Sequence, residues 1–192
     1  MKNHSARFIA AMQAYDIGKP EDALRLMEEC AESGEPAACF MTALWYHDGE
    51  GVPQDLERSA RWLARHEELA EQGSLEAQWD VGQNYRFANL LPLDIERANY
   101  WLERAAAGGC GEAQHHLAWY YETGQYAYPV DPIEAANWYR RAFEQGHPET
   151  LYLYATRILR DGQATEEAIG LLRQAAEKGL KQAEYLMRSY MH

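Results

Sequence analysis

A glycine recurs along the chain at an almost constant spacing, and this repeat constrains the fold more than any other feature of the sequence. The five positions are Gly34, Gly73, Gly109, Gly146 and Gly179, which are separated by 39, 36, 37 and 33 residues. Each has a small residue four positions later: Ala38, Ala77, Ala113, Thr150 and Ala183. A period near 36 residues is typical of arrays in which one small structural unit is copied and stacked.

Apolar and small residues lie at helical spacing on both sides of each glycine. Pairs three residues apart come before it: Ala23 and Leu26, Ala98 and Trp101, Ala135 and Trp138, and Ala168 and Leu171. Similar spacing follows it, as in Ala77, Val81 and Tyr85. The pattern predicts two amphipathic helices joined by a short turn, in which the glycine serves as a left-handed C-terminal cap.

The segments between these helix pairs contain the residues that stop a helix and start the next one. They are DGEGVPQD (48–55), PLD (92–94) and YPVDP (128–132). Proline and glycine prevent the helix from continuing, and Asp55, Asp94 and Asp131 are suitable N-caps for the helix that follows. No part of the chain shows the sustained period-two alternation of a strand, so the predicted fold class is all-α.

The expected organisation is a single repeat array over residues 1–192. An incomplete unit at 5–19 precedes repeats of about 36 residues that run from 20 to 192. The second unit has three additional residues before Gly73, which predicts a lengthened helix there. One helix pair cannot bury its apolar face alone, so neighbouring pairs must stack into an α-solenoid of antiparallel helices.

Three segments resemble a known family: residues 35–63 (EPAACFMTALWYHDGEGVPQDLERSARWL), 95–109 (IERANYWLERAAAGG) and 111–125 (GEAQHHLAWYYETGQ). They are similar to the Sel-1-like repeat, a relative of the tetratricopeptide repeat that is common in bacterial proteins. The most specific motif runs from Tyr46 through Gly49, Gly51, Val52, Pro53 and Gln54 to Asp55. The resemblance covers roughly residues 20–192. The last units depart from it, with Tyr154, Ala155 and Ile158 at positions where the family prefers Leu, Gly and Tyr, and with a short loop at 161–167.

The resemblance implies a right-handed superhelix and a non-enzymatic function as an adaptor or scaffold that binds a protein or peptide. It names no ligand. Some exported members of the family bridge their two helices with a disulfide, but Cys30 is one residue away from that pattern. We therefore favour reduced thiols at Cys30 and Cys39, with a bridge as the alternative.

In such repeats the helix that follows the glycine usually lines the inner surface, so the partner-binding candidates are read from that helix. Six residues past each glycine stand Phe40, Trp79, His115, Tyr152 and Tyr185, and ten past the third stands Trp119. Positions six and ten are four apart and therefore neighbours on one helical face. Aromatic side chains commonly anchor interfaces, so we predict a binding surface centred on Trp79, His115 and Trp119. The alternative is that each ring packs against an adjacent helix.

The charge of the chain limits the class of partner. Thirty Asp and Glu residues against eighteen Lys and Arg give a formal net charge of −12, whereas nucleic acids and anionic membranes require a basic surface. No apolar run approaches the roughly 20 residues of a membrane span, and the first fifteen residues lack a cleavage signal, so a cytoplasmic location is expected.

A search for catalytic and metal-binding patterns gives no candidate. His115 and His116 are adjacent and point about 100° apart on a helix, so they cannot chelate one ion together. The sequence HEEL at 66–69 lacks the second histidine of a zincin helix, and no nucleophile motif or phosphate loop is present. We expect no enzyme activity, no cofactor and no metal.

Two functions from different classes therefore remain. The first is an interaction module that binds a partner on its inner aromatic surface. The second is an acidic inhibitor or immunity protein that blocks a basic enzyme or toxin, which the charge of −12 favours. In both cases we expect Trp101 and Trp138 to belong to the core. We also favour a monomer over a weak dimer, because the final helix (181–192) carries a polar stripe.

Overall fold

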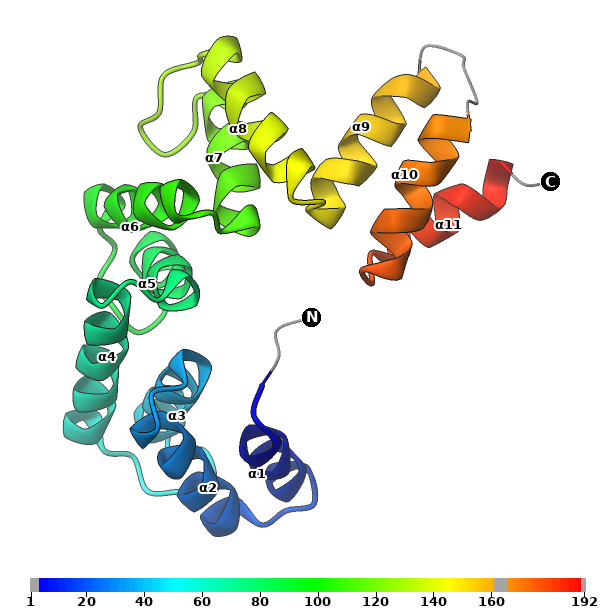
Figure 1. The fold of residues 1–192 in the computed structure, drawn as a ribbon. Helices are drawn as coiled ribbons and strands as arrows, with labels where there is room; N and C mark the ends of the chain where they lie inside the picture. The colour runs from blue at the N-terminus through cyan, green and yellow to red at the C-terminus, as the bar shows by residue number, and fades with distance from the viewer. Residues whose placement is uncertain (1–3, 161–165, 191–192) are drawn as a thin grey trace. The chain divides into compact units, whose positions relative to one another are not determined.

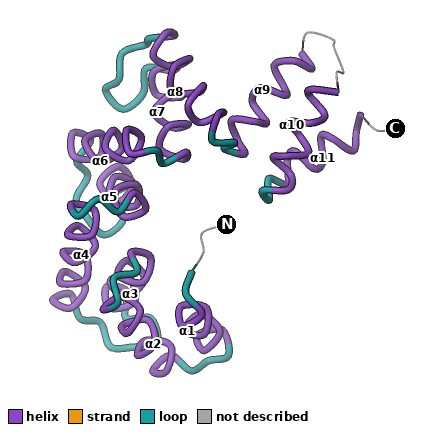
Figure 2. The backbone as a smooth tube through the Cα atoms, in the orientation of Figure 1, coloured by secondary structure: helices purple, strands orange, loops and turns teal. Residues whose placement is uncertain are grey.

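The computed structural model describes residues 4–160 and 166–190, and within these ranges every regular element is an α-helix (Figures 1 and 2). The helices are α1 (Ala6–Asp16), α2 (Pro20–Glu32), α3 (Pro36–Asp48), α4 (Leu56–Glu71), α5 (Leu75–Phe87), α6 (Ile95–Gly108), α7 (Gly111–Thr123), α8 (Pro132–Glu144), α9 (Pro148–Arg160), α10 (Glu166–Glu177) and α11 (Lys181–Tyr190). The predicted all-α fold of stacked helix pairs is confirmed. Residues 161–165 of the short loop and the last two residues of the predicted final helix, Met191 and His192, lie outside the described residues.

Local capping explains where these helices begin and end. All five repeat glycines have positive φ, between 69° and 102°, as a left-handed helix cap requires. The Asp55 and Asp94 carboxylates accept hydrogen bonds from the backbone N–H groups of Arg58 and Arg97, and Asp131 caps α8 in the same way. The predicted lengthened helix is α4, which has 16 residues.

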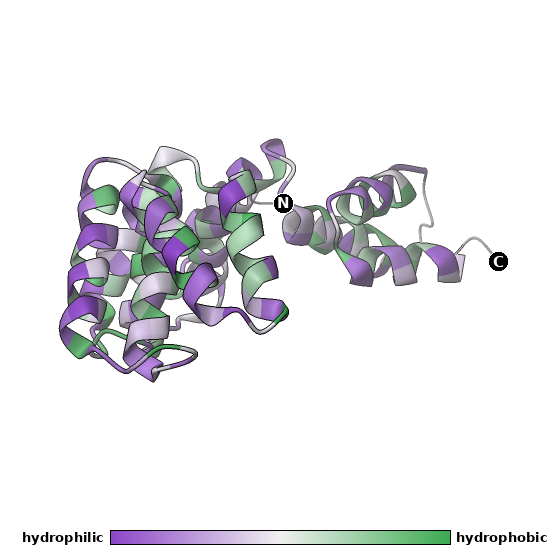
Figure 3. Ribbon diagram, turned by 90° about the horizontal axis from the view of Figure 1, so that it is seen from below, coloured by the Kyte–Doolittle hydropathy of each residue, from purple (hydrophilic) through white to green (hydrophobic). Residues whose placement is uncertain are grey.

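The helices divide into two compact units, one containing α1–α6 and the other α7–α11. In the first unit the core includes Met27, Cys39, Trp45 and Trp101, with alanines such as Ala31 fully buried where helices approach each other. The helices carry both hydrophobic and hydrophilic residues (Figure 3), and the two kinds lie on different faces of α2, α4, α6, α8, α9, α10 and α11, as in amphipathic helices. In α1, α3, α5 and α7 they are not separated in this way, so the sequence prediction of an amphipathic helix after each glycine is wrong for α3, α5 and α7. In the second unit α9, α10 and α11 share a smaller core that includes Leu151 and Leu172.

The two tryptophans that the sequence assigned to the core differ in their burial. Trp101 is only 5% exposed, which confirms its assignment. Trp138 occupies the equivalent helical position but is only half-buried, and the guanidinium carbon of Arg141 lies 4.5 Å from the centroid of its ring. Trp138 is thus covered partly by a cation rather than enclosed by helices.

Two tyrosines connect three successive helices through their hydroxyl groups. The Tyr46 hydroxyl of α3 donates to Glu28 of α2 (2.7 Å) and accepts from Arg58 of α4 (2.8 Å). The Tyr85 hydroxyl of α5 repeats this arrangement with Glu67 of α4 (2.6 Å) and Arg97 of α6 (2.8 Å). Burial, the largest cause, raises the pKa of both phenols, so they remain neutral donors at physiological pH. Charge-assisted hydrogen bonds of this kind align each helix pair on the next.

Replacing Tyr85 by phenylalanine should therefore lower the free energy of unfolding by about 1 kcal/mol. The ring is retained, so the loss measures the hydroxyl contacts with Glu67 and Arg97. Chemical denaturation measures the change, and Tyr185→Phe is the control because the Tyr185 side chain is 79% exposed. An equal effect of the two substitutions would contradict a role for the Tyr85 hydroxyl in joining the helices.

Both cysteines of the first helix pair are unbridged and buried. The Cys39 thiol lies 3.6 Å from the Ala31 carbonyl oxygen, and burial raises the pKa of Cys39 to about 11. The structure thus contains the free thiols that the sequence favoured, and neither is an activated nucleophile.

Candidate partner-binding site

The sequence-predicted site residues all lie on the helices that follow the repeat glycines, which we call the inner helices: α3, α5, α7, α9 and α11. Phe40 and Trp79 belong to the unit of α1–α6. His115, Trp119, Tyr152 and Tyr185 belong to the unit of α7–α11.

In the first unit, Phe40 lines a groove of about 320 Å³ between α1, α3 and α5, which we call the α1–α3–α5 groove. Its apolar part consists of Phe8, Ala37, Phe40 and Met41. Phe8 is held in place by its stack on His4, with ring centroids 4.2 Å apart. Phe40 itself is half-buried and its ring centroid lies 6.1 Å from that of His66 on α4. Phe40 thus packs against a neighbouring helix on one side and faces the groove on another.

The opposite wall of the groove is polar and comes from α5 and the loop after it. It is formed by Asp80, Gln83, Asn84 and Asn89. The Asn84 amide group donates to the Asp80 backbone carbonyl oxygen (2.9 Å), which fixes its orientation. Side-chain amides and a carboxylate facing an apolar floor can hydrogen-bond a peptide backbone while one of its apolar side chains is buried.

Sequence reasoning missed several lining residues of this groove, among them Phe8, Met41, Asp80 and Asn84. Met41 and Asp80 both stand seven residues past a repeat glycine, next to the aromatic position, and Asn84 stands eleven past. Positions seven and eleven form a second stripe beside the aromatic one, and reading that stripe as well would have found these three. Phe8 carries no such signal, because it precedes the first repeat glycine.

In the second unit His115 is occupied by intramolecular contacts. Its Nδ1 lies 2.9 Å from the Thr150 hydroxyl oxygen, and its ring stacks on His147 with centroids 5.0 Å apart. The Tyr139 ring is 5.5 Å away. Burial, followed by the charges of His147 and His116, lowers the pKa of His115 to about 3. The ring is therefore neutral at physiological pH and takes part in helix packing.

The other aromatic candidates of this unit differ in exposure. Trp119, one helical turn after His115, is 37% exposed and packs beside Tyr120 with centroids 5.3 Å apart. Tyr152 is half-buried against the core of α9–α11. Tyr185 is the most exposed large hydrophobic residue among the described residues, and none of their helices follows α11 to cover it. Position six after the glycine is thus a packing position in His115 and Tyr152 and an exposed one in Tyr185.

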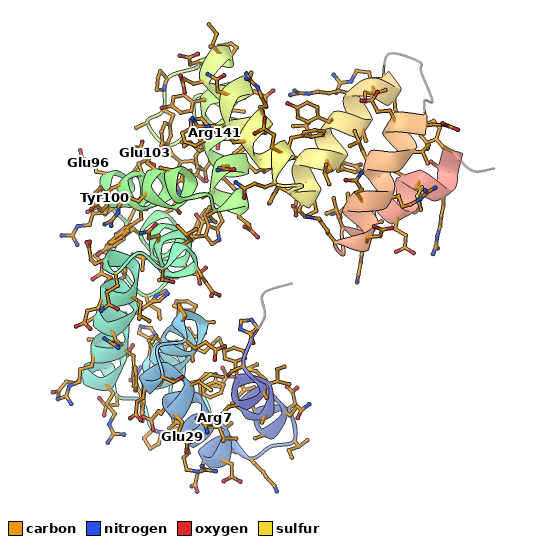
Figure 4. All side chains as sticks on the ribbon, viewed as in Figure 1. Arg7, Glu29, Glu96, Tyr100, Glu103 and Arg141 are labelled. Atoms are coloured by element: carbon orange, nitrogen blue, oxygen red, sulfur yellow. The ribbon has the colours of Figure 1, made fainter. Side chains whose placement is uncertain are left out.

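Charge is distributed unevenly along the chain. Residues 1–108 contain 19 of the 30 acidic and 10 of the 18 basic residues, a formal net charge of −9, whereas residues 109–192 have a net charge of −3. Many of the charged side chains form surface pairs, such as Arg7 with Glu29 (3.5 Å), while Glu96, Tyr100 and Glu103 project from α6 (Figure 4). The unit with the α1–α3–α5 groove is therefore the more acidic one.

The described residues contain neither a cluster suited to a metal ion nor a helix that could cross a membrane. No cluster of three or more His, Cys, Asp or Glu side chains in them is arranged to hold a metal ion. None of their helices combines the length and the apolar character that crossing a membrane requires.

Comparison with known proteins identifies the repeat. The Sel1 repeat model matches residues 36–65, 75–110, 111–147 and 150–180, which together make up more than half of the chain. The chain belongs to the Sel1 repeat family. Each matched segment begins near the start of an inner helix. The family serves as a protein-interaction scaffold. A comparison with curated protein sequences gave no match.

Several solved structures share the fold. A Sel1 repeat protein from Oxalobacter formigenes is 23% identical, with a TM-score of 0.65 over 92% of this chain and 74% of that one. The protective antigen c5321 of uropathogenic Escherichia coli, with an SLR fold, is 25% identical (TM-score 0.58), but the match covers 88% of this chain and only 36% of that one. The immunity protein PA5088 of Pseudomonas aeruginosa is 17% identical, with a TM-score of 0.58 over 96% of this chain and 70% of that one.

Proposed function

We propose that this chain is a non-enzymatic adaptor or scaffold that binds a protein partner through the inner helices. The observation that supports this most directly is the α1–α3–α5 groove, with its apolar floor and its wall of side-chain amides. The inner helices α3 and α5 line it together with α1, so an extended segment lying across them would contact more than one repeat.

The proposed occupant is an extended, positively charged segment of the partner. Asp80 provides the carboxylate of the groove wall, and the surrounding unit has a formal net charge of −9. An apolar side chain of the segment would enter between Phe40 and Met41, while a Lys or Arg next to it would approach Asp80. Opposite charges accelerate association and select against acidic segments.

Affinity purification from the native lysate with mass spectrometry would identify the partner, and calorimetry with purified components would then test the site. Phe40→Ala should weaken binding by more than about 1 kcal/mol, because the variant removes an apolar contact at the centre of the groove. Trp79→Ala and Trp119→Ala should each have an effect of similar size if the partner also contacts the inner helix that carries the residue.

Tyr100→Ala is the matched control, because Tyr100 is an aromatic residue of α6 that is 50% exposed and lies outside the inner helices. Circular dichroism confirms that each variant is folded. If the inner-helix variants and Tyr100→Ala bind the partner equally well, the partner does not use the inner helices.

The charge of the first unit favours a second candidate, an acidic inhibitor or immunity protein that blocks a basic enzyme. Solved structures with this fold include proteins named as immunity proteins. In this case the association rate should fall steeply with salt, and replacing the exposed Glu21, Glu32 and Glu96 by glutamine should slow association more than Phe40→Ala does. Stopped-flow measurements at several salt concentrations distinguish the two candidates.

A further inference from the structure

The unit of α7–α11 consists of two well-packed parts that have few contacts with each other. Helices α7 and α8 pack closely along their lengths, and so do α9, α10 and α11. Between the two parts, α8 and α9 are in contact mainly near the turn that joins them (Figure 1). The helix pairs α2–α3 and α4–α5 of the other unit, which have the same type of turn, are packed far more extensively. The α8–α9 turn therefore has the form of a hinge.

A histidine pair lies at this hinge and shares one hydroxyl group. Nδ1 of His115 on α7 and Nδ1 of His147 in the α8–α9 turn lie 2.9 Å and 3.2 Å from the Thr150 hydroxyl oxygen. Thr150, near the start of α9, is fully buried, and His147 is buried as well. A hydroxyl group donates one proton and accepts others, so two neutral rings satisfy it when one Nδ1 accepts and the other donates.

Other contacts across the hinge are few and mostly polar. The Gln145 amide donates to the Gln114 side chain (3.1 Å), Arg157 of α9 pairs with Glu122 of α7 (3.0 Å), and Phe143 packs against Tyr154 (4.7 Å between ring centroids). In the part of the chain that the structure describes, Phe143 is an apolar side chain of α8 that packs against the core of α9–α11, and the polar contacts with the histidine pair supply much of the remaining attachment.

Titratable groups from several neighbouring elements lie near the histidine pair. They are Glu112 and His116 of α7, Tyr139 of α8, Glu149 of α9 and Lys178 after α10. Glu149 is near enough to pair with a charged His147 (3.4 Å), whereas Lys178 and His116 oppose that charge. Burial, the largest cause, lowers the pKa of both rings, that of His115 to about 3. The closed arrangement therefore favours the neutral rings.

We propose that His115, His147 and Thr150 form an acid-sensitive hinge, which is closed at neutral pH and opens when the two imidazole rings are protonated. This inference goes beyond the proposed function, since it concerns the chain alone and its test requires no partner.

The direction follows from proton linkage. The ordinary pKa of histidine is about 6.5, and we take this value for the open state. Because the pKa is lowered in the closed state, the closed state is most stable relative to the open state above pH 6.5. It loses this stability as the pH falls below that value. With a pKa of about 3 in the closed state, protonation of His115 alone should raise the ratio of open to closed molecules about 30-fold between pH 7.5 and pH 5. His147 adds to this effect.

The hinge is tested by measuring the distance between α8 and α9 in the full chain at both pH values. Spin labels at the exposed positions Ala136 and Arg160, with the partly exposed Cys110 replaced by serine, report this distance by double electron–electron resonance. We expect a second, longer distance to gain population at pH 5. In the His115→Asn/His147→Asn variant the distance distribution should not depend on pH in this range, because asparagine retains a polar group near Nδ1 but does not titrate.

His47→Asn is the control, because His47 is an exposed histidine of α3 that should leave the acid response unchanged. If the double variant does not fold, the single variant His115→Asn still tests the proposal. In that variant the population of the longer distance should depend less steeply on pH, because opening is then coupled to the uptake of about one proton instead of two. An identical distance distribution at pH 7.5 and pH 5 in the parent, or an unchanged response in the histidine variants, would overturn the proposal.

Discussion

Replacing Trp101 by alanine should lower the free energy of unfolding by about 3–5 kcal/mol, the range for truncating a large aromatic residue in a core. Trp101 of α6 is almost completely enclosed and belongs to the core cluster of the α1–α6 unit. Its Cβ lies 3.3 Å from the position that a Cβ at Gly82 of α5 would occupy, so the two helices approach closely at this point. Removing the indole would leave a cavity that these close backbones cannot fill by a small shift.

Trp138→Ala provides the matched comparison, because Trp138 has the same place in its helix and is only half-buried. Its loss should be smaller, about 1–2 kcal/mol, in proportion to the apolar area that becomes exposed. Urea denaturation of the two variants and the parent measures both values. Ordinary surface substitutions change the free energy of unfolding by about 0.5 kcal/mol or less. If the loss for Trp101→Ala is no larger than that, the core assignment of Trp101 is wrong.

The features that the sequence predicted correctly are those that depend on a few neighbouring residues. A helix stops at Gly73 and starts after Asp94 because of backbone geometry and one side-chain hydrogen bond, and both signals lie within a turn of the position concerned. The period of the glycines and the three extra residues of α4 are likewise visible in the chain itself. Helix order and helix length could therefore be predicted before the structure was known.

Burial within the candidate site could not be predicted in this way. His115 and Tyr185 occupy the same position in their repeats, but His115 is covered by Tyr139 and His147, whereas Tyr185 is 79% exposed. The difference depends on which helix packs next to each residue. The α1–α3–α5 groove depends on three helices from different units of the repeat, so its lining is a tertiary property that the period alone does not contain.

The close approach of α5 and α6 leads to a prediction about two glycines within helices. Gly82 and Gly170 both lie in helix interiors, where glycine is less favourable than alanine by about 0.5–1 kcal/mol. A Cβ at Gly82 would lie 3.3 Å from both the Ala98 carbonyl oxygen and the Trp101 Cβ, whereas a Cβ at Gly170 would have no atom of the described residues within 4 Å. The same residue type is therefore required by packing at one position and not at the other.

Gly170→Ala should consequently stabilise the protein by about 0.5–1 kcal/mol, since it gains helix propensity at no steric cost. Gly82→Leu should destabilise it by about 1–3 kcal/mol, because the side chain must push α6 away from α5 and disturb Trp101. Thermal and urea denaturation of both variants give the two signs. If Gly82→Leu is as stable as the parent, α5 and α6 do not approach as closely as described. If that substitution is instead combined with Trp101→Ala, the destabilisation should be less than the sum of the two separate effects, because the cavity left by the indole accommodates part of the new leucine.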